Sequence, residues 1–119
     1  MTKILLVDDE PEVLSILSKR LQSAGYGVVT AADGKEGLEK VRAEKPDIIL
    51  LDVMMPGKDG FSMLSEMQSE DSSRKIPVIM VTARGDSRDI FQGQYLGAID
   101  YLIKPVDFEE LLKYVRKYT

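Results

Sequence analysis

Five side chains that could carry out phosphoryl or metal chemistry each lie directly after a short apolar run. They are Asp8 and Asp9, Asp52, Thr82, and Lys104. Carboxylates in a chain without histidine or cysteine are the oxygen ligands that a hard divalent cation such as Mg²⁺ prefers. A carboxylate beside such an ion can accept a phosphoryl group, a hydroxyl can donate a hydrogen bond to that group, and an ammonium can pair with its charge. The pattern predicts Mg²⁺-dependent phosphoryl chemistry with Asp52 as acceptor.

Taken singly, each of these residues has a plainer explanation. The Asp8-Asp9 pair precedes Pro11 and could cap a helix whose first turn is acidic. Asp52 could be a solvated loop residue, Thr82 a common strand-end residue, and Lys104 a surface charge. A shared site is favoured because all of them follow the same end of their elements.

Composition limits the classes of function. The chain has 119 residues, of which 44% are apolar and 30% charged, as expected for a single globular domain spanning residues 1–119. The absence of cysteine and histidine excludes disulfides, ordinary zinc sites, thiol nucleophiles and histidine-based triads. A net charge of −4 argues against a nucleic-acid partner. No apolar run is long enough for a signal peptide or a membrane span, so a cytoplasmic protein is expected.

Apolar runs of strand length alternate with segments of helical spacing. The runs cover residues 4–7, 28–32, 48–51, 78–81 and 99–103. The helical segments are centred on Val13 to Leu21, on 34–44, on Phe61 to Met67, on 90–96 and on Phe108 to Val115. Helix N-caps are expected at or near Asp33, Asp59 and Asp86. Such alternation is typical of βα units around a parallel sheet.

The polarity of the runs predicts the order of the strands. Central parallel strands are buried on both faces and are therefore continuously apolar, which fits the first, third and fourth runs. The second run contains Thr30 and the fifth contains Asp100, so these two belong at the edges. The expected fold is α/β, a doubly wound, flavodoxin-like (βα)5 sheet of order 2-1-3-4-5. In such a sheet ligands bind at the carboxyl ends of the strands, between the first and the third.

The chain resembles a response-regulator receiver domain, the phosphoacceptor module of two-component signalling, over residues 3 to 118. The matching motifs are Ile4-Leu5-Leu6-Val7-Asp8-Asp9-Glu10, Leu51-Asp52-Val53-Met54-Met55-Pro56, Asp59-Gly60, Thr82-Ala83 and Lys104-Pro105. The resemblance implies that Asp52 accepts a phosphoryl group from the phosphohistidine of a sensor histidine kinase or phosphotransfer domain. It also implies that Asp9, Asp52 and the backbone carbonyl of Met54 bind Mg²⁺, with Asp8 assisting.

The resemblance also implies a switch. Lys104 would contact the phosphoryl group, and its peptide bond to Pro105 would be cis. The Thr82 hydroxyl would turn towards the phosphoryl group, and Tyr101 would rotate into the space that it leaves. The output surface would then be the fourth helix, the fifth strand and the fifth helix.

This output surface is expected to bind a downstream effector, and it could also serve a phosphorylation-dependent homodimer. Its candidate residues are Ile90, Gln94 and Tyr101. Gly93 and Gly97 in or after the fourth helix favour a movable surface, since glycine weakens a helix.

Two other functions use similar architectures. A phosphatase of the haloacid-dehalogenase type also has an aspartate nucleophile and Mg²⁺, but it needs a second carboxylate two residues later, where this chain has Met54. A flavodoxin-like electron carrier needs a phosphate cradle after its first strand, where Asp8, Asp9 and Glu10 would repel a phosphate. The expected function is therefore a signalling switch and not a turnover enzyme. Met54 is also expected to tune the access of water, so the phosphoryl lifetime stays open.

Overall fold

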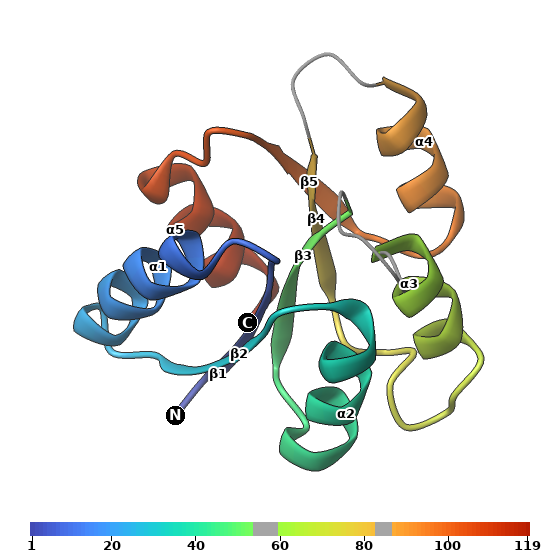
Figure 1. Ribbon diagram of the computed structural model, residues 1–119, viewed down its shortest axis with the longest axis horizontal. Helices are drawn as coiled ribbons and strands as arrows, with labels where there is room; N and C mark the ends of the chain where they lie inside the picture. The colour runs from blue at the N-terminus through green and yellow to red at the C-terminus, as the bar shows by residue number, and fades with distance from the viewer. Residues whose placement is uncertain (54–59, 83–86) are drawn as a thin grey trace.

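The computed structural model describes residues 1–53, 60–82 and 87–119. Strands and helices alternate along them (Figure 1). The strands are β1 (Lys3–Val7), β2 (Gly27–Ala31), β3 (Ile48–Asp52), β4 (Val78–Thr82) and β5 (Asp100–Ile103). The helices are α1 (Pro11–Ser23), α2 (Gly34–Glu44), α3 (Gly60–Gln68), α4 (Ser87–Tyr95) and α5 (Phe108–Tyr118). All the strand pairs are parallel and the order is β2-β1-β3-β4-β5, which confirms the doubly wound, flavodoxin-like prediction.

Burial follows the predicted division between central and edge strands. Every residue of β3 and β4 is buried, and in β1 only Lys3 is not. In β2 four of the five residues are half-buried, and in β5 only Leu102 is buried. The continuous apolar runs thus form the middle of the sheet, because a parallel strand covered by helices on both faces exposes no side chain.

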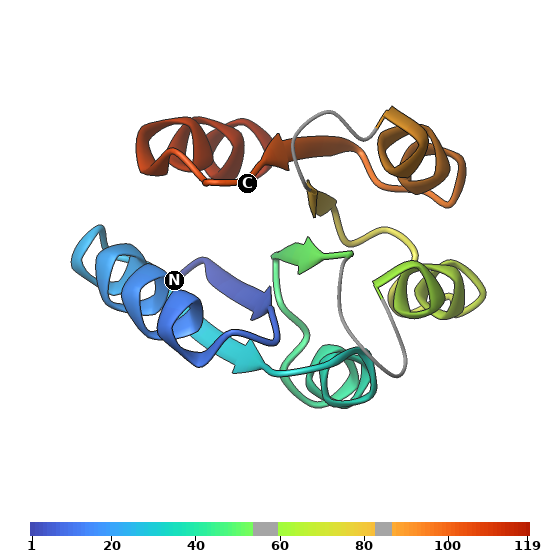
Figure 2. The ribbon, with the colours of Figure 1, turned by 45° about the horizontal axis from the view of Figure 1, so that its top comes forward.

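The two faces of the sheet carry separate cores. Successive side chains of a strand point to opposite faces, so Leu5 and Leu51 join the core under α2, α3 and α4, whereas Leu6 and Leu50 join the core under α1 and α5. Figure 2 shows the sheet between these two layers of helices. None of the described helices is both long and apolar enough to span a bilayer.

Side-chain caps begin two of the helices. The carboxylate of Asp33 accepts a hydrogen bond from the Glu36 N–H at 2.8 Å, as predicted for a cap at the start of α2. Asp107 caps α5 in the same way, through the Glu109 N–H at 2.9 Å. The caps expected at Asp59 and Asp86 lie outside the described residues.

Helix α4 begins three residues earlier than the segment 90–96 predicted from apolar spacing. Its Gly93 is buried against β4, where an added Cβ would collide with the Met80 side chain. The absence of a side chain therefore lets the helix approach the sheet closely. Gly97, just after the helix, has φ +109°, a conformation that favours glycine.

Candidate functional site

The carboxyl ends of β1, β3 and β5 bring three of the predicted residues together. Val7 pairs with Leu51, so Asp8 and Asp52 follow at the same edge of the sheet. Strand alternation places both carboxylates, and Lys104 after β5, on the face covered by α1 and α5. The Lys104 Nζ lies 2.9 Å from Asp52 Oδ2 and 3.7 Å from Asp8 Oδ2.

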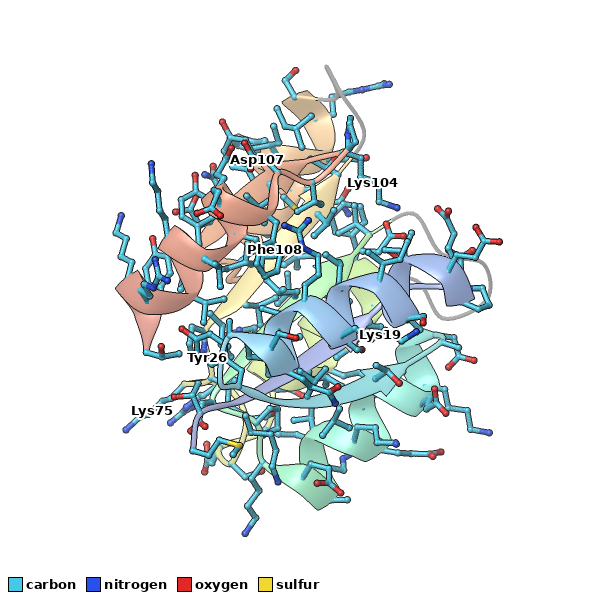
Figure 3. All side chains as sticks on the ribbon, turned by 90° about the vertical axis from the view of Figure 1, so that its left-hand side faces the viewer. Lys19, Tyr26, Lys75, Lys104, Asp107 and Phe108 are labelled. Carbon is cyan, nitrogen blue, oxygen red and sulfur yellow. The ribbon has the colours of Figure 1, made fainter. Side chains whose placement is uncertain are left out.

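The backbone around Lys104 explains how its side chain reaches the carboxylates. Its N–H donates to the Thr82 carbonyl at 2.9 Å, which continues the β4–β5 pairing by one residue. The peptide bond to Pro105 is cis, as the resemblance implied. Figure 3 shows Lys104 at the opposite end of the sheet from Lys75, which precedes β4.

Burial makes the electrostatics of this group strong. The side chains of Asp52, Asp8 and Lys104 are 1%, 10% and 29% exposed. Burial is the main cause that raises the pKa of Asp8; the charge of Asp52 adds to this rise, while a backbone hydrogen bond from Glu10 and the charge of Lys104 oppose it. Burial also acts to lower the pKa of Lys104, but its hydrogen bond to Asp52 and the surrounding carboxylates outweigh that effect and raise it. Lys104 is therefore held as a cation.

Asp8 does not cap α1, the plainer explanation considered for it. Its Oδ1 accepts a 2.8 Å hydrogen bond from the Glu10 N–H, which fixes the turn between β1 and the helix. The N-cap residue of α1 is Glu10, whose side chain makes no capping bond. This turn leaves the second oxygen of Asp8 directed towards Lys104.

Glu10 also lies near Lys104 and was not among the predicted site residues. Its Oε1 lies 3.6 Å from Lys104 Nζ. One carboxylate oxygen from each of Asp8, Asp9 and Glu10 lies within 4.8 Å of the others, with Asp9 and Glu10 exposed. The three consecutive acids in the sequence were the signal that could have identified it.

The two predicted switch residues face the other layer of the molecule. Thr82 is fully buried at the end of β4, next to Val81, which pairs with Asp52. Alternation places Thr82 on the face of Met80, and Met80 pairs with Tyr101. Tyr101 is partly buried against the core on that face. Thr82 thus lies at the same edge of the sheet as the acids, but on the face that α4 covers. The predicted metal ligand Met54 lies outside the described residues.

Comparisons with known proteins point to one family. The family model for the response regulator receiver domain matches residues 4–116. The chain is 42% identical over 113 residues to "Protein PilH" of Pseudomonas aeruginosa, covering 95% of this chain and 93% of that protein. It is 42% identical over 116 residues to "DNA-binding dual master transcriptional regulator RpaA" of Synechocystis sp., covering 98% of this chain but 48% of that protein. The chain spans about half the length of several such curated relatives.

Solved structures show the same fold. The crystal structure of chemotaxis protein CheY4 from Vibrio cholerae superposes with a TM-score of 0.93 at 35% identity, covering 100% of this chain and 99% of that one. A putative response regulator from Chloroflexus aurantiacus also gives 0.93 at 35% identity, covering 98% and 96%. The family model accounts for nearly the whole chain, and the structural likeness extends over the same residues. The chain therefore belongs to the response regulator receiver domain family of two-component signalling.

Proposed function

We propose that this receiver domain is a phosphoacceptor switch in which Asp52 receives the phosphoryl group. The observation that carries the proposal is the pairing of the Asp52 carboxylate, which is only 1% exposed, with the Lys104 ammonium 2.9 Å away, beside the cluster of Asp8, Asp9 and Glu10 that follows β1. In this proposal residues 1–119 act as a single receiver domain. The donor is the phosphohistidine of a sensor histidine kinase or phosphotransfer domain.

The donor set suits Mg²⁺. Its side-chain ligands are all carboxylate oxygens, and the chain has no histidine or cysteine that would favour a softer metal. Asp8 and Asp9 would hold the ion together with Asp52, and the Met54 carbonyl is the further ligand expected from the family. When bound, Mg²⁺ offsets the negative charge of the carboxylates and of the incoming phosphoryl oxygens.

The residues of this chain then have distinct tasks. An oxygen of Asp52 forms the new bond to phosphorus while the bond from phosphorus to the donor imidazole nitrogen breaks, and that nitrogen keeps the electron pair. Lys104 moves from pairing with the carboxylate to pairing with the transferred phosphoryl oxygens. The β3 strand holds Asp52 rigid, because every residue of that strand is buried.

The switch in this proposal runs from Thr82 to the α4–β5–α5 surface. The Thr82 hydroxyl turns towards the phosphoryl group, and Tyr101, on the same face of the sheet, moves into the space that is vacated. The surface bears exposed aromatic residues that suit a partner: Phe91 is 72% exposed and Tyr95 is 82% exposed. Of the residues predicted for this surface, Gln94 is exposed and Ile90 packs partly against the core. A downstream effector or a second phosphorylated copy would bind here.

Incubation with an acyl phosphate and Mg²⁺, followed by intact-mass measurement, tests the proposal directly. The wild-type chain should gain one phosphoryl group, and chelation of the metal should prevent the gain. Asp52→Asn should show no gain. The matched control Asp71→Asn, at an exposed carboxylate outside the site, should be modified like the wild type. Modification that persists in Asp52→Asn would overturn the assignment.

A further inference from the structure

An apolar cavity lies beside Asp8, Glu10 and Asp52, between α1 and the segment that connects β5 to α5. Its volume is about 560 Å³, within the range of pockets that hold small organic molecules. Its floor is formed by Leu6, Leu50 and Val81 from the three central strands. Phosphoryl transfer to Asp52 uses none of these side chains.

Helix α1 buries less of its apolar stripe than its sequence predicts. The sequence predicts an inward stripe of Val13, Leu14, Leu17 and Leu21, but only Leu21 is fully buried. The other three residues line the cavity and are half-buried, as is Val106, which lines it from the β5–α5 connection. Much apolar surface is therefore left partly uncovered.

Near the carboxyl end of α1, one contact joins this helix to α5. The Arg20 guanidinium lies 4.1 Å from the centre of the Phe108 ring, at the start of α5, in a cation–π contact. Figure 3 shows Phe108 against α1, with Lys104 nearer the carboxyl ends of the strands. This contact joins α1 to α5 outside the cavity, since neither residue lines it.

Charged side chains also line the cavity. The side chains of Asp8, Glu10 and Asp52 supply three negative charges there, and Lys104 supplies one positive charge. Asp8 and Asp52 are nearly or fully buried, so their charges are weakly screened. The resulting excess of two negative charges attracts a cation and repels an anion.

We propose that this cavity binds a small amphipathic organic cation, with an aromatic or alkyl body against Leu6, Leu14 and Leu17 and an ammonium or amidinium group facing Asp8 and Glu10. A bare metal ion would satisfy the carboxylates but leave the apolar walls uncovered. A neutral apolar molecule would cover the walls but gain nothing from the charges. Such a ligand would occupy the receiver in its metal-free, unphosphorylated form, so the proposal does not depend on phosphorylation of Asp52.

Binding of three probes of the same shape tests this inference. The dissociation constants of 2-naphthylmethylammonium, 2-naphthylmethanol and 2-naphthoate are measured by NMR titration of the metal-free protein. The ammonium probe should bind at least tenfold more tightly than the carboxylate, with the alcohol between them. Glu10→Gln should weaken the ammonium probe by roughly two- to fivefold, as expected for loss of a partly exposed charge, and leave the alcohol unchanged.

Variants that fill the cavity locate the site. Val13→Phe and Val106→Phe, on opposite walls, should each weaken the ammonium probe at least tenfold, and either one suffices if the other does not fold. Ile99→Phe adds the same ring at a partly exposed position outside the cavity and should leave binding unchanged. Equal binding of the ammonium and carboxylate probes, or wild-type binding by a folded cavity variant, would overturn the inference. Failure of all three probes to bind would overturn it as well and would leave the cavity to the side chains of a docking protein.

Discussion

The phenol of Tyr118 donates a 2.8 Å hydrogen bond to Oδ2 of Asp100, which ties the last turn of α5 to the edge strand β5. The other oxygen of that carboxylate accepts the N–H of Tyr101 at 2.9 Å. Burial raises the pKa of Tyr114, and the charge of Asp100 adds to that rise. One carboxylate therefore connects the proposed switch residue with the end of the chain's final helix.

Replacing Tyr118 by phenylalanine should loosen this connection. The variant loses one hydrogen bond to a half-buried carboxylate, which we expect to lower the free energy of unfolding by about 1 kcal/mol. Urea denaturation measures this change. Tyr95→Phe is the matched control, because Tyr95 is 82% exposed, and it should leave stability unchanged. Equal stabilities of the two variants would show that the Tyr118 contact does not stabilise the fold.

Gly60, at the start of α3, packs against the backbone of Asp52, the proposed phosphoacceptor, and of Val53. An added Cβ would lie 2.7 Å from the Asp52 carbonyl oxygen and 2.7 Å from the Val53 Cα. Backbone atoms cannot move aside as a flexible side chain can. Gly60→Ala should therefore lower the free energy of unfolding by about 1–3 kcal/mol, despite the better helix propensity of alanine.

Thermal and urea unfolding check this prediction, with Ser65→Ala on the exposed face of the same helix as the control. The control should differ from the wild type by less than about 0.5 kcal/mol. Wild-type stability of Gly60→Ala would mean that α3 can shift away from the end of β3 without cost.

The order of the strands could be predicted because burial on two faces requires continuously apolar sequence. The runs of β3 and β4 carry that signal, and Thr30 and Asp100 mark the edges. Apolar spacing did not mark the start of α4, because its first residues, Ser87 to Asp89, are polar, and only the cap expected at or near Asp86 pointed to that start. The role of Asp100 also required the structure, since its partner Tyr118 lies 18 positions further along the chain.

The site residues at strand ends could be predicted from the sequence. The residue whose place depends on a turn could not. Asp8, Asp52 and Lys104 follow three parallel strands, so the topology alone brings them together. The place of Glu10 depends on the turn that Asp8 makes with its N–H, and no periodic pattern encodes such a turn. The cavity beside α1 could not be predicted either, because the apolar stripe of that helix looks the same whether or not a neighbouring element covers it.

The raised pKa of Asp8 predicts how stability depends on pH in the absence of metal. The folded protein holds the proton of Asp8 more tightly than the unfolded chain does, mainly because the carboxyl is buried. The contribution of this group to stability is therefore fully present below its ordinary pKa of 3.8 and is lost as the pH rises through the higher value of the folded state. Asp8→Asn, which stays neutral, should be more stable than the wild type at pH 7 and lose that advantage in acid.

Urea denaturation in the presence of a chelator, repeated from neutral to acidic pH, measures this difference. Asp71→Asn is the control and should follow the wild type, since Asp71 is exposed. Mg²⁺ should stabilise the wild type at pH 7 more than it stabilises Asp8→Asn. A constant gap between Asp8→Asn and the wild type at every pH would show that ionisation of Asp8 is not its cause.

Lys104→Ala should separate the chemistry of Asp52 from the switch. The variant removes the ammonium that lies 2.9 Å from Asp52 Oδ2, but it leaves the carboxylate and the acid group in place. Phosphorylation by an acyl phosphate with Mg²⁺ should therefore continue at a reduced rate, as measured by intact mass. The NMR signals of β5, above all those of Tyr101, should shift less on phosphorylation than in the wild type, because the residue directly after β5 can no longer pair with the phosphoryl group. Lys113→Ala, at an exposed lysine of α5, should behave like the wild type in both measurements. Wild-type shifts at Tyr101 in the phosphorylated Lys104→Ala variant would show that Thr82 alone transmits the change.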